Sequence, residues 1–273
     1  LNINQSTISN HISELEARLG MRLCDRGRRG FRLSSKGKRV YEETVNLFKA
    51  HEHFQSVTLE LKGKMSGFLN IGVIDNVITD NECPIVKALS LLNNKSEEVT
   101  CRLEIMTPLD LERGLLDMSI DVAIGTFDRQ LSGLKYDKIY VEDNQLYAGI
   151  NNPILKVSSK NKLRKAVSQA RKVTRSYLEG RDLLPVGNNR KIGNANVSNL
   201  EAAGLLILSG RHIGFLPRHY AKIWIDSGEM KSILENEYKY ESDFYLVTRK
   251  NPRESIILKT FLEDLSTVIN QKK

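Results

Sequence analysis

Residues 5–19 repeat their apolar side chains at the spacing of one helical face, and this pattern limits the fold more than any other in the chain. The apolar residues recur at steps of four, three and four: Ile8, Ile12, Leu15 and Leu19. These steps place them in one narrow stripe of an α-helix, with Asn4 and Gly20 at its two ends. The segment is either an ordinary amphipathic surface helix or one member of a packed helical unit.

The opposite face of this helix carries short polar side chains. Hydroxyl and amide groups of this size can lie close to base edges and phosphates in a major groove. We therefore expect six residues to contact DNA: Gln5, Ser6, Thr7, Ser9, Asn10 and Ser13.

A strongly basic segment follows the helix. Between Arg18 and Arg39, nine Lys or Arg residues stand against one acid, Asp25. Two short extended runs within it flank residues 27–30, which is the pattern of a two-stranded hairpin. Basic side chains at a hairpin tip can reach phosphates or a minor groove. We expect three of them to contact DNA: Arg28, Arg29 and Arg32.

The positive charge of the whole chain is also concentrated toward its amino-terminal end. Residues 1–64 hold 12 basic and 7 acidic residues, whereas residues 65–273 hold 29 and 26. The basic excess is therefore concentrated where a nucleic-acid-binding segment is predicted. Three cysteines at no metal-ligand spacing fit a reduced cytosol. Without a signal peptide or a membrane-length apolar run, the chain is expected to be cytoplasmic, with no membrane partner.

Residues 35–62 are predicted to form one long helix with a short heptad seam, which Glu43 interrupts. The seam residues are expected to mediate dimerisation: Val40, Leu47, Ala50, Phe54, Val57 and Leu61. Pairing of two such helices would present two recognition helices to a pseudo-palindromic site. The alternative is that this helix packs against the chain's own domain.

The rest of the chain alternates strands and helices, which predicts an α/β domain with a largely parallel sheet. Strands are expected at 68–74, 100–106, 121–124, 172–174, 214–217 and 242–248. Helices are expected at 85–92, 109–116, 198–209 and 255–268. A second lobe begins near residue 151, and the chain returns to the first lobe near Tyr238.

The amino-terminal motifs resemble those of the LysR-type family of bacterial transcription regulators. The matching residues are Gln5-Ser6-Thr7, Ser9, Ile12, Leu15-Glu16, Leu19-Gly20, Arg22-Leu23, Arg26, Leu33 and Gly37. Leu200–Pro217 is similar to the family's effector domain, while Cys24 stands where the family commonly has Phe. The family also has residues before this point that form further helices. The resemblance therefore implies a truncated chain in which the apolar stripe of residues 8–19 lacks part of its cover.

The resemblance implies a mixed fold. A partial, all-α winged helix-turn-helix domain (1–34) and a linker or dimerisation helix (35–64) would precede a two-lobed α/β effector domain similar to periplasmic solute-binding proteins. Lobe I would comprise residues 65–150 and 238–273, and lobe II residues 151–237. The implied partners are promoter DNA, once the missing helices are present, a small-molecule effector and further copies of the chain, as a homo-oligomer (dimer or tetramer).

The effector is expected between the lobes, beside the ends of the strands. The candidate residues are Asp75, Asn76, Thr107, Thr126, Phe127, Arg175, Asn196, Phe215 and Pro217. The family commonly has a hydroxyl residue after each of the first two strands. Thr107 fits this pattern, but Asp75 does not and would repel an anion unless it were paired, for which Arg175 is a candidate.

No enzyme, metal or cofactor motif is present: the sequence has no P-loop, dinucleotide fingerprint, nucleophile elbow or metal-ligand spacing. We predict a ligand-responsive transcription regulator with no catalytic residue, no metal and no cofactor. Two alternatives remain: a small-molecule-binding protein that does not touch DNA, and a truncated regulator that acts through mixed oligomers. Eight basic residues between Lys156 and Arg175 could meet DNA or an acidic partner, although a solvated helix face is favoured.

Overall fold

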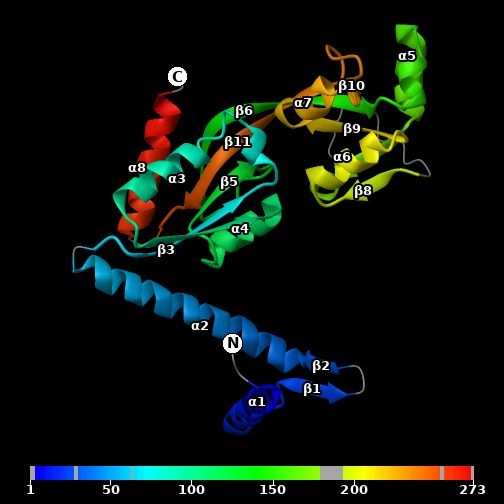
Figure 1. Cartoon of the computed structure of the whole chain (residues 1–273). Helices are drawn as coiled ribbons and strands as arrows, with labels where there is room; N and C mark the ends of the chain where they lie inside the picture. The colour runs from blue at the N-terminus through cyan, green and yellow to red at the C-terminus, as the bar shows by residue number, and fades with distance from the viewer. Residues whose placement is uncertain (1–3, 28–29, 63, 179–192, 253–254, 272–273) are drawn as a thin grey trace. The chain divides into compact units, whose positions relative to one another are not determined.

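The computed structural model describes residues 4–27, 30–62, 64–178, 193–252 and 255–271 (Figure 1). The chain divides into two compact units, Leu1–Gly67 and Phe68–Lys273. Among the described residues, no helix is both long and apolar enough to cross a membrane.

The smaller unit contains the predicted helix, hairpin and long helix. Its elements are α1 (Gln5–Leu19), β1 (Cys24–Gly27), β2 (Gly30–Leu33) and α2 (Ser35–Glu60). The strands β1 and β2 pair antiparallel, with Asp25 opposite Arg32. The Glu16 carboxylate holds α1 to this hairpin, because its Oε1 accepts hydrogen bonds from the backbone N–H groups of Leu23 and Cys24 at 2.6 and 2.9 Å.

The junction between hairpin and long helix requires a glycine. The Ser34 hydroxyl accepts a hydrogen bond from Gly37 N at 3.0 Å and donates one to the Arg22 carbonyl at 2.9 Å, which caps α2 against the hairpin. This contact is so close that a Cβ at Gly37 would lie 1.9 Å from the Leu23 carbonyl oxygen. There is therefore a steric reason for a glycine at position 37, because any larger residue would clash with the backbone of Leu23.

The larger unit is built on one sheet of nine strands among the described residues. Along the sheet the order is β4, β3, β5, β11, β6, β9, β7 and β8, and β10 pairs with β6. The strands are β3 (Gly67–Val73), β4 (Val99–Ile105), β5 (Val122–Thr126), β6 (Leu134–Gly149), β7 (Arg171–Arg175), β8 (Ala195–Val197), β9 (His212–Pro217), β10 (Met230–Ser232) and β11 (Lys239–Arg249).

Two groups of helices accompany these strands. Lobe I combines β3, β4 and β5 with η1 (Val77–Thr79), α3 (Ile85–Lys95), α4 (Pro108–Leu116) and α8 (Ile256–Asn270). Lobe II combines β7 to β10 with η2 (Pro153–Lys156), α5 (Lys160–Gln169), η3 (Ser176–Leu178), α6 (Leu200–Leu208) and α7 (Arg218–Asp226). In lobe I, α3 and α8 lie side by side on one face of the strands, and α4 lies on the other (Figure 1).

The long strands β6 and β11 join the two lobes. They pair antiparallel from Leu134 to Gln145, β5 adds to β11 at one end, and β9 adds to β6 at the other. The sheet is therefore mixed, and the prediction of a largely parallel sheet was wrong. Parallel pairs occur within each lobe, as in β3 with β5 and β7 with β9, whereas the connection between lobes needs strands that run in opposite directions.

Each lobe has its own hydrophobic core. In lobe I, Leu111 and Leu115 of α4 pack on Ala123 and Val247 of the sheet. In lobe II both faces of β6 are covered. Tyr147 points into the apolar cluster formed with α6 and α7. Its neighbours Leu146 and Ala148 point to the other face, into the apolar cluster formed with η2 and α5. The two lobes therefore have separate cores. In the described sheet they are connected by the two long strands β6 and β11.

Candidate effector site and nucleic-acid interface

A cavity of about 340 Å³ lies between the two lobes. Its lining comes from the ends of β3 and β4, the amino terminus of α4, η3 and the amino terminus of α6: Asp75, Ile105, Met106, Thr107, Asp110, Tyr177, Ser198 and Asn199. Asp75 and Thr107 are therefore placed together, as predicted for residues that follow neighbouring strands. Neither Lys nor Arg is among these lining residues.

Both helix amino termini at this cavity already have acidic partners. In α4, the Thr107 hydroxyl accepts a hydrogen bond from Asp110 N at 3.3 Å and donates one to Asp110 Oδ2 at 2.6 Å. In α6, the Asp75 carboxylate crosses from lobe I and accepts a hydrogen bond from Leu200 N at 2.5 Å. The positive end of each helix dipole thus has one of the protein's own carboxylates beside it, bonded to a backbone N–H in α6 and placed in the first turn in α4.

Asp75 also faces the guanidinium of Arg175. Arg175 Nη1 lies 3.9 Å from Asp75 Oδ1, and the two side chains are only 8% and 16% exposed. Burial acts to lower the pKa of Arg175, but the surrounding Tyr177, Tyr240 and Asp75 raise that pKa overall, so the guanidinium stays charged. The pairing that the sequence suggested is present, although Arg175 is not among the residues that line the cavity.

The other predicted effector residues are not among those that line this cavity. Outside its lining, within the described part of the chain, are Asn76, Thr126, Phe127, Arg175, Asn196, Phe215 and Pro217. Phe127 packs edge-on against Tyr136 at 5.5 Å between ring centroids, and Phe215 against Tyr240 at 5.3 Å. Both rings complete the hydrophobic cores, because strand ends contribute to the core as well as to the cleft.

The lining also contains Ile105, Met106, Tyr177 and Ser198, together with two helix-capping residues that the sequence reasoning missed, Asp110 and Asn199. Asp110 had a local signal in Thr107-Pro108-Leu109-Asp110, which has the spacing of a helix-capping box. Asn199 had a similar one, because it is the N-cap of α6 and its Oδ1 accepts a hydrogen bond from Ala202 N at 2.9 Å. Capping residues at a cleft are site residues too, since the helix ends there are what a ligand meets.

The polar face of α1 is open to solvent as a DNA-reading face requires. Of the six predicted residues, Ser9 is half-buried. The other five are exposed: Gln5, Ser6, Thr7, Asn10 and Ser13. Ser13 donates a hydrogen bond to the Ser9 carbonyl at 2.9 Å. Arg32 is exposed on β2, whereas Arg28 and Arg29 lie outside the described residues.

The apolar stripe of α1 is largely exposed, with Ile12 half-buried. Ile8, Leu15 and Leu19 are all exposed large hydrophobic side chains, and α1 contains no buried residue. A second apolar row lies along α2, where Leu47, Phe54 and Leu61 are exposed at intervals of seven residues. Ala50 is exposed as well, and Val40 and Val57 are partly buried. These exposed apolar rows are typical of helices that pair with others.

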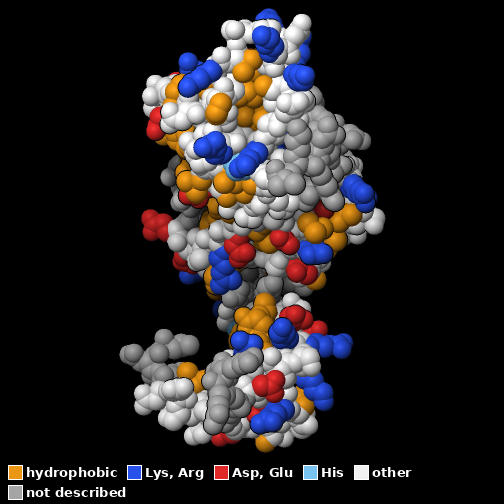
Figure 2. Space-filling view, turned by 90° about the vertical axis from the view of Figure 1, so that its right-hand side faces the viewer, with side chains coloured by type: hydrophobic (Ala, Val, Ile, Leu, Met, Phe, Trp, Pro, Cys, Tyr) orange, Lys and Arg blue, Asp and Glu red, His pale blue; other side chains and the backbone are white. Residues whose placement is uncertain are grey.

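The basic run in lobe II is mostly a solvated surface. Lys160, Lys162 and Lys165 of α5 are exposed, and Figure 2 shows Lys and Arg side chains at this end of the larger unit interspersed with apolar and uncharged ones. Arg164 is engaged by Glu237 through two hydrogen bonds of 2.7 and 2.8 Å. Arg175 is buried beside Asp75 and so does not belong to this surface.

The cysteines have the character of structural thiols. Cys24 and Cys83 are buried, and Cys101 is half-buried. Burial raises the pKa of the Cys101 thiol, which lowers its thiolate fraction at neutral pH and hence its reactivity toward oxidants.

Two family descriptions match most of the chain. Residues 62–269 match the "LysR substrate binding domain", and residues 1–38 match "Bacterial regulatory helix-turn-helix protein, lysR family". The chain is 36% identical over 267 residues to the HTH-type transcriptional activator BauR of Pseudomonas aeruginosa. This alignment covers 96% of this chain and 86% of BauR. It is 31% identical over 124 residues to the HTH-type transcriptional regulator YtlI of Bacillus subtilis, or 45% of this chain and 39% of that one.

Solved structures of full-length regulators share the fold. The Vibrio cholerae virulence activator AphB is similar with a TM-score of 0.61 at 20% identity, over 97% of this chain and 90% of that one. CbnR in complex with its target DNA is similar with a TM-score of 0.65 at 19% identity, over 97% and 91%. At these identities the likeness bears on the fold alone, and it confirms the predicted combination of a winged helix-turn-helix region and a two-lobed α/β domain.

Proposed function

This chain belongs to the LysR family of bacterial transcription regulators, and from that membership we propose that it binds promoter DNA as an oligomer and responds to a small effector held beside Asp75. The observation that carries the effector site is the cavity of about 340 Å³ between the lobes. We place the protein in the cytoplasm, where promoter DNA lies, and assign it no catalysis, because its relatives are named as regulators.

The effector proposed for this cleft carries a cationic nitrogen. Among the described lining residues, Asp75 and Asp110 are the only charged ones. Asp75 already accepts a hydrogen bond from the amino terminus of α6, and Asp110 lies in the first turn of α4. An effector carboxylate would have to displace Asp75 from Leu200 N, whereas an ammonium group would add a favourable partner to Asp110. Both carboxylates face an arginine at 3.9 Å, but the Asp110–Arg113 pair is exposed and screened by water, whereas the Asp75–Arg175 pair is buried, so Asp110 is the better partner.

The effector would act by shifting a population of lobe arrangements. The lobes have separate cores, so their relative position depends on β6, β11 and contacts across the cleft such as Asp75 with α6. A ligand that contacts α4 and α6 together binds one arrangement better than others and so stabilises it. In an oligomer this change would alter the spacing of the DNA-binding units.

A thermal-shift screen of the full-length chain tests the effector class. The compounds are matched sets that share a carbon skeleton and end in an amine, an alcohol or a carboxylate. The amine that fits should stabilise the effector domain by about 2.7 kcal/mol at 100 times its Kd, which raises Tm by roughly 5 to 10 °C for a domain of this size. Its carboxylate counterpart should leave Tm unchanged.

Two variants of α4 show whether the shift comes from the cleft. Asp110→Asn should remove most of the amine-dependent rise in Tm, because it removes the charge that faces the ligand. Asp117→Asn makes the same change at the exposed carboxyl end of α4 and should leave the rise intact. Stabilisation by the carboxylates alone, undiminished in Asp110→Asn, would reverse the proposed effector charge.

Arg32→Ala tests the DNA-binding face. Arg32 is exposed on β2, opposite Asp25 in the hairpin, and the proposed contact is to phosphate. Its removal should weaken binding to all duplex sequences alike and reduce the slope of log K against log salt by about one unit per bound subunit. Fluorescence anisotropy over a salt series measures this slope. Lys87→Ala, which removes an exposed charge from α3, is the control and should not change it.

A further inference from the structure

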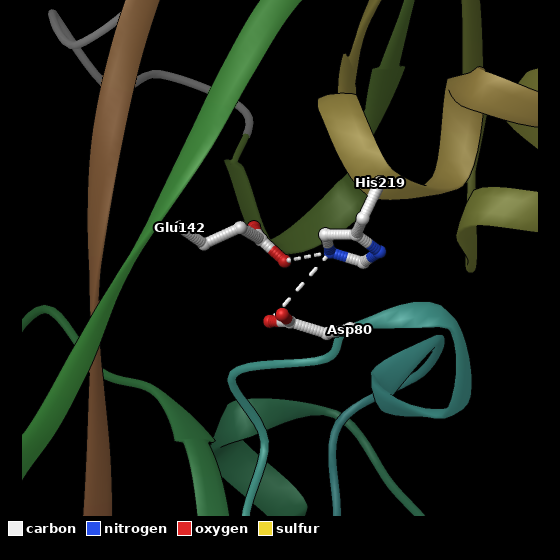
Figure 3. A group of neighbouring side chains, drawn as sticks. All are labelled: Asp80, Glu142 and His219. Atoms are coloured by element: carbon white, nitrogen blue, oxygen red, sulfur yellow. Dashed lines mark hydrogen bonds and ion pairs between the residues drawn. The ribbon is translucent and has the colours of Figure 1, made fainter. Parts of the chain in front are cut away.

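Three side chains that the proposed effector site does not use meet where the two lobes and the crossing strand come together. Asp80 lies in the loop after η1 in lobe I, Glu142 in the middle of β6, and His219 in the first turn of α7 in lobe II (Figure 3). They are 62 and 77 residues apart along the chain. Their metal-binding atoms all lie within 4.8 Å of one another.

The three groups face one another with the geometry of an incomplete coordination shell. His219 Nε2 is 3.0 Å from Glu142 Oε1 and 3.7 Å from Asp80 Oδ2. Nitrogen and oxygen ligands about 2.1 Å from a tetrahedral zinc ion lie roughly 3.4 Å from each other. A small shift of each side chain therefore suffices to place all three around one ion.

Each of the three side chains is oriented by a second partner on its other polar atom. The His219 Nδ1 atom lies 2.8 Å from the Thr79 hydroxyl. Asp80 Oδ1 accepts a hydrogen bond from Glu82 N at 2.9 Å, and Glu142 Oε2 accepts one from the Asn144 amide at 3.1 Å. This arrangement leaves Nε2, Oδ2 and Oε1 directed toward a common point, as outer-shell partners do in metal sites.

Among the described residues, no Lys or Arg forms an ion pair with either carboxylate, although the charge of Arg175 acts on Glu142 from a longer distance. The Asp80 and Glu142 side chains are only 7% and 8% exposed, and the buried Asp80 Oδ2 atom accepts no hydrogen bond of normal geometry. Two buried carboxylates whose oxygens lie within 4.8 Å repel each other unless a cation joins them. A divalent ion would balance the charge of both carboxylates, and the imidazole Nε2 of His219 is a third ligand atom within reach.

We propose that Asp80, Glu142 and His219 bind one divalent transition-metal ion, of which Zn²⁺ is the type, and that this ion joins the two lobes. The site adjoins a surface hollow of about 530 Å³ that all three residues line, which provides a route in and space for a water as fourth ligand. One nitrogen and two oxygen ligands suit Zn²⁺ better than Ca²⁺ or Mg²⁺, which prefer oxygen alone. Metal binding would hold lobe II at a defined position against lobe I.

Titration calorimetry of the full-length chain, first stripped of metal with a chelator, tests this site with ZnCl₂ alone. The wild type should bind one Zn²⁺ per chain. His219→Gln and Asp80→Asn should abolish this binding, and Thr79→Ala, which removes only the partner of Nδ1, should weaken it by about 10- to 100-fold. His212→Gln is the control, because its ring contacts the Gly193 carbonyl in lobe II, and it should bind as the wild type does.

A spectroscopic readout keeps the test independent of how well the variants fold. Co²⁺ added to the stripped wild type should give the visible absorption of a four- or five-coordinate ion, and Zn²⁺ should displace it. The proposal is overturned if the wild type gives neither a calorimetric signal nor this absorption. It is equally overturned if His219→Gln binds Zn²⁺ as tightly as the wild type, in which case the three residues only contact one another and hold no ion.

Discussion

A chain that carries both Leu47→Glu and Phe54→Glu is expected to behave as a 31.0 kDa monomer, whereas the unmodified chain should behave as a dimer or a tetramer. Both side chains are exposed on α2 at an interval of seven residues. Paired helices bury such a row, and glutamates opposite each other there would repel and lose their hydration. Light scattering after size-exclusion chromatography gives the mass directly.

The same double variant should also change how the protein responds to salt on DNA. A dimer that places two winged units on a duplex neutralises about twice as many phosphates as a monomer, so the monomer's salt slope should be about half as steep. Its apparent affinity should fall by about 10² to 10⁴, because the second unit no longer binds at a high effective concentration. Both quantities come from anisotropy on one duplex over a salt series.

Phe48→Glu decides whether the heptad row is the pairing face. Phe48 is as exposed as its neighbour Leu47, but it lies about 100° away around the helix and outside the row. This variant should keep the oligomeric mass and the salt slope of the unmodified chain. A monomer from Phe48→Glu together with a dimer from the double variant would assign pairing to a different face of α2.

Local patterns predicted those elements whose burial alternates in a simple way. The stripe of Ile8 to Leu19 gave α1, and the strand predicted at 172–174 is β7 (Arg171–Arg175). The crossing strand β6 was missed for a physical reason. A bulge opposite Phe244 and Tyr245 interrupts its alternation, and its buried central positions are the polar residues Glu142 and Asn144. A hydrophobic period cannot reveal the middle of a strand when the buried side chains there are polar.

The two candidate sites differ in the same way: one could be predicted from local sequence patterns and the other could not. Asp75 and Thr107 follow neighbouring strands, so strand ends were enough to bring them together. Asp80, Glu142 and His219 come together only because β6 passes between the lobes and α7 begins immediately after β9. No spacing along the chain encodes such a cluster, since its three members come from elements that are far apart in the sequence and meet only in the folded chain.

Asp75→Ala is expected to destabilise lobe II by about 3 kcal/mol, the lower end of the range for breaking a buried ion pair. The change leaves Arg175, which is 7% exposed, without its carboxylate partner and removes the acceptor for Leu200 N. Asp75→Asn should cost less, because the amide oxygen still accepts that hydrogen bond. Urea unfolding followed by the fluorescence of Trp224, the single tryptophan, reports on lobe II, since this ring packs against the α6 cluster.

An exposed pair of nearly the same length provides the control. Arg218 Nη1 lies 3.8 Å from Asp143 Oδ2, but these side chains are 62% and 58% exposed, so Asp143→Ala should cost no more than about 1 kcal/mol. A double variant, Asp75→Asn with Arg175→Met, should recover part of the loss, because no buried charge is then left alone. If Asp75→Ala costs only as much as Asp143→Ala, the Asp75 carboxylate is free to bind a ligand. The cationic effector inferred from its engagement would then have to rest on Asp110 alone.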